Sequence, residues 1–424
     1  QEDAPPPPPP PLPPPLPPSS NQVGEIGADG NKIEQKITSR AITYSASSAG
    51  SEMMSPNSAH HSSDSKERPM SPRILAQMPL PTADGSYTSP TGSGLTFDGT
   101  FKGWSYASRP DIRLGELVAV DFLGKGHFGE VKCVAWRPNK GPETKGLYAL
   151  KILERDRFEN KMVASGRSEE YYIFNEREIM IEVNSSFHIK LINTYKSSKN
   201  LYILMEYAPG RNLKDQIERG KGLTDSSQQG ALNRVKFYAA NLVLAMQHLH
   251  RRQITHRDLK PGNILIDNQG YLKVCDYGFS RWLPIGGKTR SIAGTYNYLT
   301  PEQCLDDDYD HNVDIWCLGI TVYNMSYGVT PFEAPEGAAD WQKITMNNIQ
   351  NKPLSFIEST RDLPMPGKLF VKSILSREPK RFGYDLNYEA IKTHVWFNGV
   401  DFDALENRSL KSPWIPDLDD PNKF

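Results

Sequence analysis

The stretch HRDLKPGN, residues 256–263, places an imidazole, a guanidinium, a carboxylate, an ammonium group and an amide within eight consecutive residues. A run of charged residues is usually a solvated loop, but the flanking sequence favours another interpretation. Val235–His250 carries apolar residues at helical spacing, which predicts a helix with one face in the core. Residues 264–266 and 271–274 flank the turn sequence DNQG, which predicts two short strands. We therefore expect a tight loop braced by buried elements, a common place for chemistry.

The first 110 residues differ in composition from the rest of the chain. They contain more than half of the 34 prolines and no sustained apolar periodicity, and a proline-rich run occupies Pro5–Pro18. Such a segment cannot bury enough apolar surface to offset the entropy lost on ordering. We expect residues 1–110 to be a disordered Pro/Ser/Gly-rich region, and deletion of residues 1–105 to change catalysis only a few fold. Pro5–Pro18 is either a ligand for a polyproline-binding partner or a semi-rigid spacer.

Charge, apolar runs and cysteine usage exclude several classes of protein. The formal net charge is −1, so no strong field favours nucleic acid or an anionic membrane. The longest apolar helical segment contains Asn241, Gln247 and His248, which argues against a membrane span. The four cysteines show no CxxC or other metal-ligand spacing, which fits a reducing compartment. We expect no nucleic-acid partner, no membrane span and a cytoplasmic protein, with the nucleus as the alternative.

A glycine-rich stretch, LGKGHFGEV at residues 123–131, lies between two segments that have the composition of strands. In a dinucleotide-binding unit the glycines open a helix, whereas these glycines are expected to cap a hairpin. Backbone amides of such a hairpin can close over phosphates, although an ordinary glycine-rich turn is the alternative.

Lys151 and Glu176 are the candidate ion pair of this region. Lys151 lies in an apolar strand at residues 147–153, where a lysine is usually on the exposed face. Glu176 shares a helical face with apolar residues, and Ser168 is a plausible N-cap for that helix. A carboxylate on an apolar face is costly unless it is paired, so we expect a Lys151–Glu176 pair that orients the lysine toward phosphate oxygens.

The order of motifs is glycine-rich hairpin, strand lysine, helix glutamate, HRDLKPGN, CDYG at residues 275–278 and TPE at residues 300–302. This ordered set resembles the protein-kinase signature over residues 115–400. The DLKPGN loop resembles the serine/threonine type. GGKTRSIAGT, PKRFG, THVWF and SPWIPDL resemble AGC kinases, most closely the cyclic-nucleotide-dependent kinases.

The resemblance implies an α+β, bilobal protein kinase fold at residues 111–397. A small, mainly β N-lobe would occupy residues 111–207 and a larger, mainly α C-lobe residues 208–397. Residues 398–424 would form an AGC-type tail, which we expect to be truncated. The implied activity is transfer of the γ-phosphate of ATP to serine or threonine hydroxyls of protein substrates.

The resemblance also implies the catalytic and metal-binding residues. Asp258 would receive the proton of the substrate hydroxyl, and Lys260 would steady the transferring phosphoryl group. Thr295 would contact the catalytic aspartate. Asn263 and Asp276 would hold Mg²⁺, a hard ion suited to oxygen ligands.

The nucleotide-binding and supporting residues follow from the same resemblance. Lys151 would bind the α- and β-phosphates of ATP, and Glu176 would hold Lys151. A buried pair of Glu302 and Arg381 would tie the activation segment to the C-lobe, and Asp314 would anchor the catalytic loop. The implied ATP-binding residues are Leu123, Gly124, Lys125, Gly126, His127, Phe128, Gly129, Val131, Ala149, Lys151, Met205, Glu206, Ala208 and Leu265.

Several positions depart from the family pattern. Tyr277 replaces the DFG phenylalanine, and Thr300 replaces the APE alanine. Gly262, Asn212 and Asn324 stand where AGC kinases carry acidic residues that recognise basic substrates. We therefore expect weak selection for arginine before the acceptor. A pseudokinase scaffold is the alternative to an active kinase, although the catalytic lysine, glutamate, aspartates and asparagine are all present.

Two further residues carry expectations of regulation and reactivity. Ser291 precedes Thr295 by four residues, and a phosphate on it would face Arg257 and Arg281, so we expect a regulatory phosphosite. An unmodified loop serine is the alternative. Cys275 is expected at the back of the nucleotide pocket with a modestly reactive thiol, the alternative being an inert core cysteine.

Overall fold

The computed structural model describes residues 104–125, 129–158, 169–220, 222–224, 227–291, 293–358, 362–377, 381–383 and 386–418. Most of the expected disordered region, including Pro5–Pro18, lies outside the described residues, as does Ser168. Trp104–Pro110 belongs to the same expected region but is described, and it lies against the folded domain.

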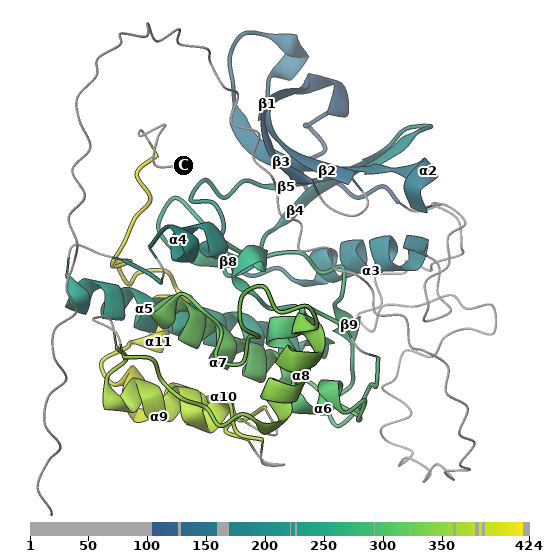
Figure 1. Ribbon diagram of the computed structural model, residues 1–424. Helices are drawn as coiled ribbons and strands as arrows, with labels where there is room; N and C mark the ends of the chain where they lie inside the picture. The colour runs from purple at the N-terminus through teal and green to yellow at the C-terminus, as the bar shows by residue number, and fades with distance from the viewer. Residues whose placement is uncertain are drawn as a thin grey trace, which may run out of the picture. The chain divides into compact units, whose positions relative to one another are not determined.

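A five-stranded antiparallel sheet with the order β1-β2-β3-β5-β4 forms the first lobe (Figure 1). Helix α3 (Glu169–Glu182) lies between this sheet and the helices of the second lobe (Figure 1). The other elements of the first lobe are η1 (Leu114–Glu116), β1 (Leu117–Lys125), β2 (Gly129–Trp136), η2 (Pro138–Lys140), β3 (Gly146–Glu154), α2 (Arg155–Phe158), β4 (Leu191–Lys196) and β5 (Asn200–Glu206).

The register of the central strands places the glycine-rich turn over the strand lysine. Val131 of β2 is opposite Lys151 of β3, and Ala149 of β3 is opposite Met205 of β5. Gly129 begins β2 so close to β3 that a Cβ there would lie 1.7 Å from the Ile152 carbonyl oxygen. Only glycine fits at this position, because any side chain would push the two strands apart.

The second lobe is built mainly from helices. The long helix α5 (Gln228–Arg251) begins at Ser227, whose side chain accepts a hydrogen bond from the Gly230 amide. The remaining helices are α4 (Leu213–Gly220), α6 (Pro301–Cys304), α7 (Asn312–Tyr327), α8 (Trp341–Asn351), α9 (Met365–Ile374), α10 (Tyr388–Lys392) and α11 (Phe402–Glu406). The short strands and 3₁₀ turns are β6 (Ile254–Thr255), η3 (Pro261–Asn263), β7 (Ile264–Ile266), β8 (Leu272–Val274), β9 (Arg281–Trp282), η4 (Tyr296–Tyr298) and η6 (Val395–Phe397).

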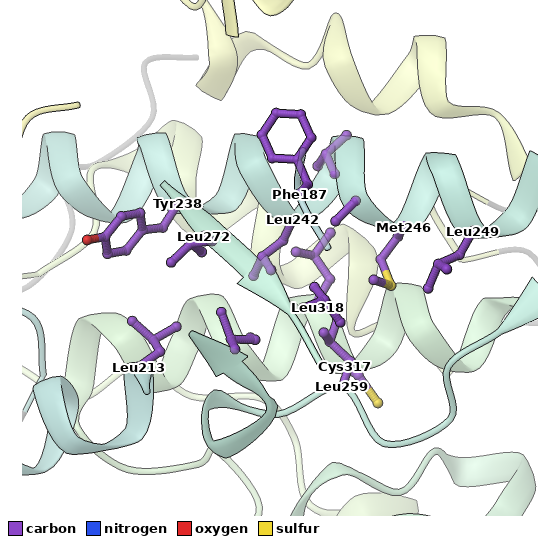
Figure 2. Packing of buried hydrophobic residues seen from close by; sticks show 14 of the residues in the cluster. Phe187, Leu213, Tyr238, Leu242, Met246, Leu249, Leu259, Leu272, Cys317 and Leu318 are labelled. Carbon is purple, nitrogen blue, oxygen red and sulfur yellow. The ribbon is translucent and has the colours of Figure 1, made fainter. Parts of the chain in front are cut away.

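The core of the second lobe fixes the charged loop. Leu242 and Met246 of α5 face Leu318 of α7 in this core (Figure 2). Leu259, from the middle of HRDLKPGN, is itself 0% exposed and belongs to the same cluster. Burial of one leucine side chain stabilises the folded state by about 1.5–3 kcal/mol, so the loop is anchored by its own apolar residue.

The expected fold class is confirmed. Val235–His250 lies inside α5, and the predicted strands on either side of the DNQG turn are β7 and β8. Within the described ranges, no helix is both long and apolar enough to cross a membrane. Residues of the tail lie on the helical lobe, where the Ser412 hydroxyl donates to the Gly270 carbonyl and Arg234 stacks 3.9 Å from the Trp414 ring centroid.

Candidate active site

The loop HRDLKPGN is held from beneath by Asp314 of α7. Its carboxylate accepts hydrogen bonds from the His256 amide at 2.7 Å and the Arg257 amide at 2.8 Å. His250 Nε2 lies 2.9 Å from the same carboxylate. Burial opposes the charge of Asp314, but the hydrogen bond from His250 holds its pKa below the usual value. The predicted anchoring role of Asp314 is confirmed.

Asp258 is the centre of a compact polar cluster. The side chain of Asp258 is almost fully buried, and Thr295 Oγ1 donates to its Oδ1 at 2.8 Å. The other carboxylate oxygen, Oδ2, lies 2.9 Å from Lys260 Nζ and 3.0 Å from Asn263 Nδ2. Lys260 Nζ also lies 2.7 Å from Thr295 Oγ1. The structure therefore brings four of the predicted site residues together, and hydrogen bonds fix the orientation of the carboxylate.

Lys151 of β3 and Glu176 of α3 form the expected ion pair. The ammonium group lies 2.6 Å from Glu176 Oε1 and 2.8 Å from Oε2. Burial disfavours the charged ammonium, yet the carboxylates of Glu176 and Asp276 hold the pKa of Lys151 above its usual value. A lysine held as a cation is suited to bind phosphate oxygens.

Asp276 and Tyr277 are adjacent in the chain but differ in exposure. Asp276 is exposed and has a φ of +64°, in the left-handed region, whereas Tyr277 is 0% exposed. His256 Nε2 lies 3.2 Å from the Cys275 carbonyl, which ties the CDYG segment to the catalytic loop. The charges of Asp276, Lys151, Glu176 and Lys260 all act on the Cys275 thiol, so the two polar clusters share one region. Burial raises the pKa of that thiol.

The donor set fits a magnesium ion that is bound mainly through phosphates. Asn263 Nδ2 donates to the backbone oxygen of Asp258, which directs the amide oxygen Oδ1 to the other side. Asp276 adds an exposed carboxylate. Among the described residues no three His, Cys, Asp or Glu side chains form a cluster suited to a metal ion. One carboxylate and one amide match Mg²⁺, which keeps several water or phosphate oxygens as ligands.

The expected adenine-binding segment follows β5. Met205 and Glu206 end this strand, and Ala208 is buried just after it. The Glu206 side chain forms a salt bridge with Lys273 Nζ at 2.8 Å, which leaves only its backbone groups for the expected contact with adenine. Leu265 lies in β7, on the opposite lobe.

The glycine-rich hairpin is described on both sides of its tip. Leu123, Gly124 and Lys125 end β1, and Gly129 and Val131 lie in β2, with Gly124 opposite Val131. Gly126, His127 and Phe128 lie outside the described residues.

Ser291 lies beside the arginine of the catalytic loop. Arg257 Nη1 donates to Ser291 Oγ at 2.8 Å, and Tyr309 donates its hydroxyl to the Ser291 carbonyl. Arg281 Nη1 donates to Thr289 Oγ1 at 2.6 Å, two residues before Ser291. Both arginines that we expected around a phosphate thus bind residues in this part of the activation segment. The expected Glu302–Arg381 pair is also present, at 2.6 Å.

Three residues that support the site had no clear sequence signal. His188 binds the Tyr277 hydroxyl, Lys273 binds Glu206, and Trp104 packs against α3. Each contact joins residues at least 67 positions apart in the chain. A tyrosine at the DFG phenylalanine position was the one hint, since a buried hydroxyl needs a partner.

Comparison with known proteins agrees with the geometry. The protein kinase domain family matches residues 117–397. Serine/threonine-protein kinase sck2 of Schizosaccharomyces pombe is 33% identical over 71% of this chain and 44% of its own length. Serine/threonine-protein kinase sgk-1 of Caenorhabditis elegans is 33% identical over 69% of this chain and 58% of its own length.

Cyclic-nucleotide-dependent kinases are among the relatives. A cGMP-dependent protein kinase of Drosophila melanogaster, isozyme 2 forms cD5/T2, is 33% identical over 72% of this chain and 26% of its own length. The chain thus spans less than two thirds of the length of each of these relatives. It belongs to the protein kinase family, in the AGC group of serine/threonine kinases.

Proposed function

We propose that this chain is an active serine/threonine protein kinase that transfers the γ-phosphate of ATP to hydroxyl groups of protein substrates. The observation that carries the proposal is the Asp258 carboxylate, held on both oxygens by Thr295, Lys260 and Asn263. A scaffold that had lost catalysis would have no need to keep this buried carboxylate oriented. The names of the relatives sck2 and sgk-1 support the serine/threonine class.

In the proposed mechanism Asp258 binds the substrate hydroxyl and accepts its proton as the hydroxyl oxygen attacks phosphorus. Lys260 lies beside the same carboxylate and places a positive charge where the transferring phosphoryl group passes. Thr295 holds both side chains in position. Lys151, oriented by Glu176, binds the α- and β-phosphates of the nucleotide.

The proposed nucleotide site lies between the glycine-rich hairpin and Leu265. Ala149 and the backbone of Met205–Ala208 would contact the adenine, while Leu123 and Val131 would cover it from the sheet. Asn263 and Asp276 would hold Mg²⁺, which neutralises phosphate charge when it is bound.

Ser291 is the proposed regulatory phosphosite. The donor nearest to it, Arg257, belongs to the catalytic loop, so a phosphate on Ser291 would bridge the activation segment to that loop. Arg281 would have to exchange its bond to Thr289 for one to the phosphate.

The proline-rich run and the cysteines support proposals for a partner and a location. Pro5–Pro18, outside the described residues, would bind an aromatic-lined groove of a partner. A pull-down that compares residues 1–20 with a variant carrying serine for each proline tests this. The four free cysteines fit a cytoplasmic protein, with the nucleus as the alternative, and imaging of the tagged chain tests it.

The deciding experiment is phosphotransfer from ATP–Mg²⁺ to a serine peptide by the full chain. Asp276→Asn is the matched variant, because it keeps size and polarity but removes the charge that binds the metal. We expect it to abolish turnover and to leave the melting temperature nearly unchanged, since Asp276 is exposed. Wild-type turnover in Asp276→Asn, or an inactive wild type phosphorylated at Ser291, would defeat the proposal.

A further inference from the structure

Tyr277 and His188 meet in the interior of the domain, away from the phosphate-binding groups. Both side chains are 0% exposed. The Tyr277 hydroxyl lies 2.9 Å from His188 Nδ1 and 3.2 Å from the Val274 carbonyl oxygen. The other ring nitrogen of His188, Nε2, lies 3.1 Å from the Ala245 carbonyl oxygen in α5.

These distances determine which group donates each hydrogen bond. A carbonyl oxygen can only accept, so Nε2 of His188 carries the ring proton. Complete burial disfavours the imidazolium form, which leaves Nδ1 as an acceptor. The single proton of the Tyr277 hydroxyl can go to Nδ1 or to the Val274 carbonyl, and donation to Nδ1, the nearer acceptor, is what satisfies the ring nitrogen. A phenylalanine at position 277 would leave a fully buried acceptor without its donor, an arrangement that is costly.

The backbone around His188 is rigidly joined to the segment that leads to Asp276. The Ile189 amide donates to the Val274 carbonyl at 2.9 Å, and the Val274 amide donates to the Phe187 carbonyl at 2.8 Å. On its other side the Tyr277 ring lies 5.5 Å from the His256 ring, measured between centroids. Tyr277 is thus held between the loop before β4, helix α5 and the catalytic loop.

The orientation of Asp276 depends on its neighbour. Its φ of +64° is unfavourable for a residue with a side chain, and such conformations persist only where the surroundings impose them. Because the exposed Asp276 directly precedes the fully buried Tyr277, fixing Tyr277 in the interior fixes the backbone that carries the Asp276 carboxylate. The charge of that carboxylate acts on Lys151.

We propose that Tyr277 and His188 are positioning residues whose hydrogen bond keeps Asp276 in the orientation that binds the metal–nucleotide complex. The inference rests on the proposed kinase function and deepens it. The pair replaces the purely apolar contact that a phenylalanine would make at position 277.

The test compares the wild type, Tyr277→Phe, His188→Leu and the double variant in the full chain. Calorimetry measures the affinity for ADP with and without Mg²⁺. The ratio of these two affinities is the metal-dependent gain. We expect this gain to fall about tenfold in Tyr277→Phe, an effect of ~1.4 kcal/mol. Affinity without metal should stay within about twofold, because Lys151 is untouched. The double variant should recover most of the metal-dependent gain, because it removes both polar partners and so leaves neither of them buried without a hydrogen bond.

Tyr238→Phe is the control for the loss of a buried tyrosine hydroxyl. That hydroxyl accepts a hydrogen bond from Arg234 Nε at 3.2 Å, within α5 of the helical lobe. We expect it to lower thermal stability and to leave the metal-dependent gain unchanged. If Tyr277→Phe does not fold, His188→Leu tests the inference instead, and its metal-dependent gain must be smaller than that of the wild type.

Two results would overturn the inference. One is a wild-type or larger metal-dependent gain in Tyr277→Phe, and the other is a double variant as impaired as Tyr277→Phe. The readout is nucleotide binding, so it is independent of phosphotransfer. A wild type that binds Mg²⁺–ADP but does not phosphorylate peptides would defeat the proposed function and leave this inference standing.

Discussion

Replacing Trp104 with alanine is expected to impair the kinase, although this residue precedes the domain start that the sequence predicted. Trp104 is 1% exposed, and its Nε1 donates to the Tyr195 carbonyl of β4 at 2.9 Å. Its ring packs edge-on against Phe174 of α3 at 5.4 Å between centroids. Its carbonyl oxygen accepts a hydrogen bond from Arg177 Nε at 3.0 Å. Trp104 thus joins α3 to the edge of the sheet.

The size of the expected loss of activity follows from the position of these contacts on α3. Arg177 is adjacent to Glu176, whose carboxylate orients Lys151. Truncating a buried tryptophan to alanine costs about 3–5 kcal/mol. Suppose that ~1.4 kcal/mol of this loss affects only the arrangement of α3 in which Glu176 is paired with Lys151. The ratio of molecules with this pair to molecules without it then falls about tenfold. We therefore expect kcat/KM for a serine peptide to fall about tenfold or more in Trp104→Ala.

Two deletions form a matched pair for this prediction. Deleting residues 1–101 retains Trp104 and should leave kcat/KM unchanged. Deleting residues 1–105 removes the buried Trp104, so we now expect it to lower activity by more than the few fold that composition suggested. Hydrogen exchange of the α3 amides should rise only in the second protein and in Trp104→Ala. Arg109→Ala, on the same segment but with an exposed side chain paired to Asp111, is the control. Equal activity and equal α3 exchange in the two deletions would refute the reasoning.

Three further predictions concern regulation, specificity and reactivity. Ser291→Ala should lower kcat about tenfold, because no phosphate can then bind Arg257, and mass spectrometry of active protein should find Ser291 phosphorylated. Gly262→Glu should strengthen selection for arginine before the acceptor by about 1.5–3 kcal/mol on a peptide array. A Cβ at position 262 meets only Lys260 Cε, at 3.9 Å, so the variant should fold normally. Cys275 should react slowly with a mild electrophile carried by an ATP-site ligand, because burial raises the pKa of its thiol. Rapid labelling of Cys275 that ATP prevents would contradict this prediction.

Sequence periodicity and motif order were sufficient to predict the architecture of the domain. The apolar spacing of Val235–His250 predicted α5, and the DNQG turn predicted β7 and β8. These patterns are local, so the residues that create them are close in the chain. The Lys151–Glu176 pair was also predictable, since a carboxylate on an apolar helical face requires a cation.

Long-range partners of buried polar groups were not predictable. Tyr277 needed an acceptor, but its position gave no reason to choose His188, 89 residues earlier. Trp104 was assigned to the Pro/Ser-rich region because composition averages over many residues and hides a single buried side chain. The modest reactivity expected of Cys275 is revised to a low one for a related reason: neighbouring charges were visible in the sequence, but the burial that raises the pKa of the thiol was not.

The departures from the family pattern are matched by local contacts, which argues against a decayed active site. Asn212 stands where a substrate-binding acid is usual, and its Oδ1 accepts a hydrogen bond from the Asp215 amide at the start of α4. Asn324 replaces another acid, and its Oδ1 lies 3.4 Å from the Tyr298 hydroxyl. Tyr277 has its own acceptor. These contacts accommodate the substituted side chains in the fold without disturbing the catalytic cluster. The altered rim together with the intact Asp258 cluster is what a kinase with a changed substrate preference requires.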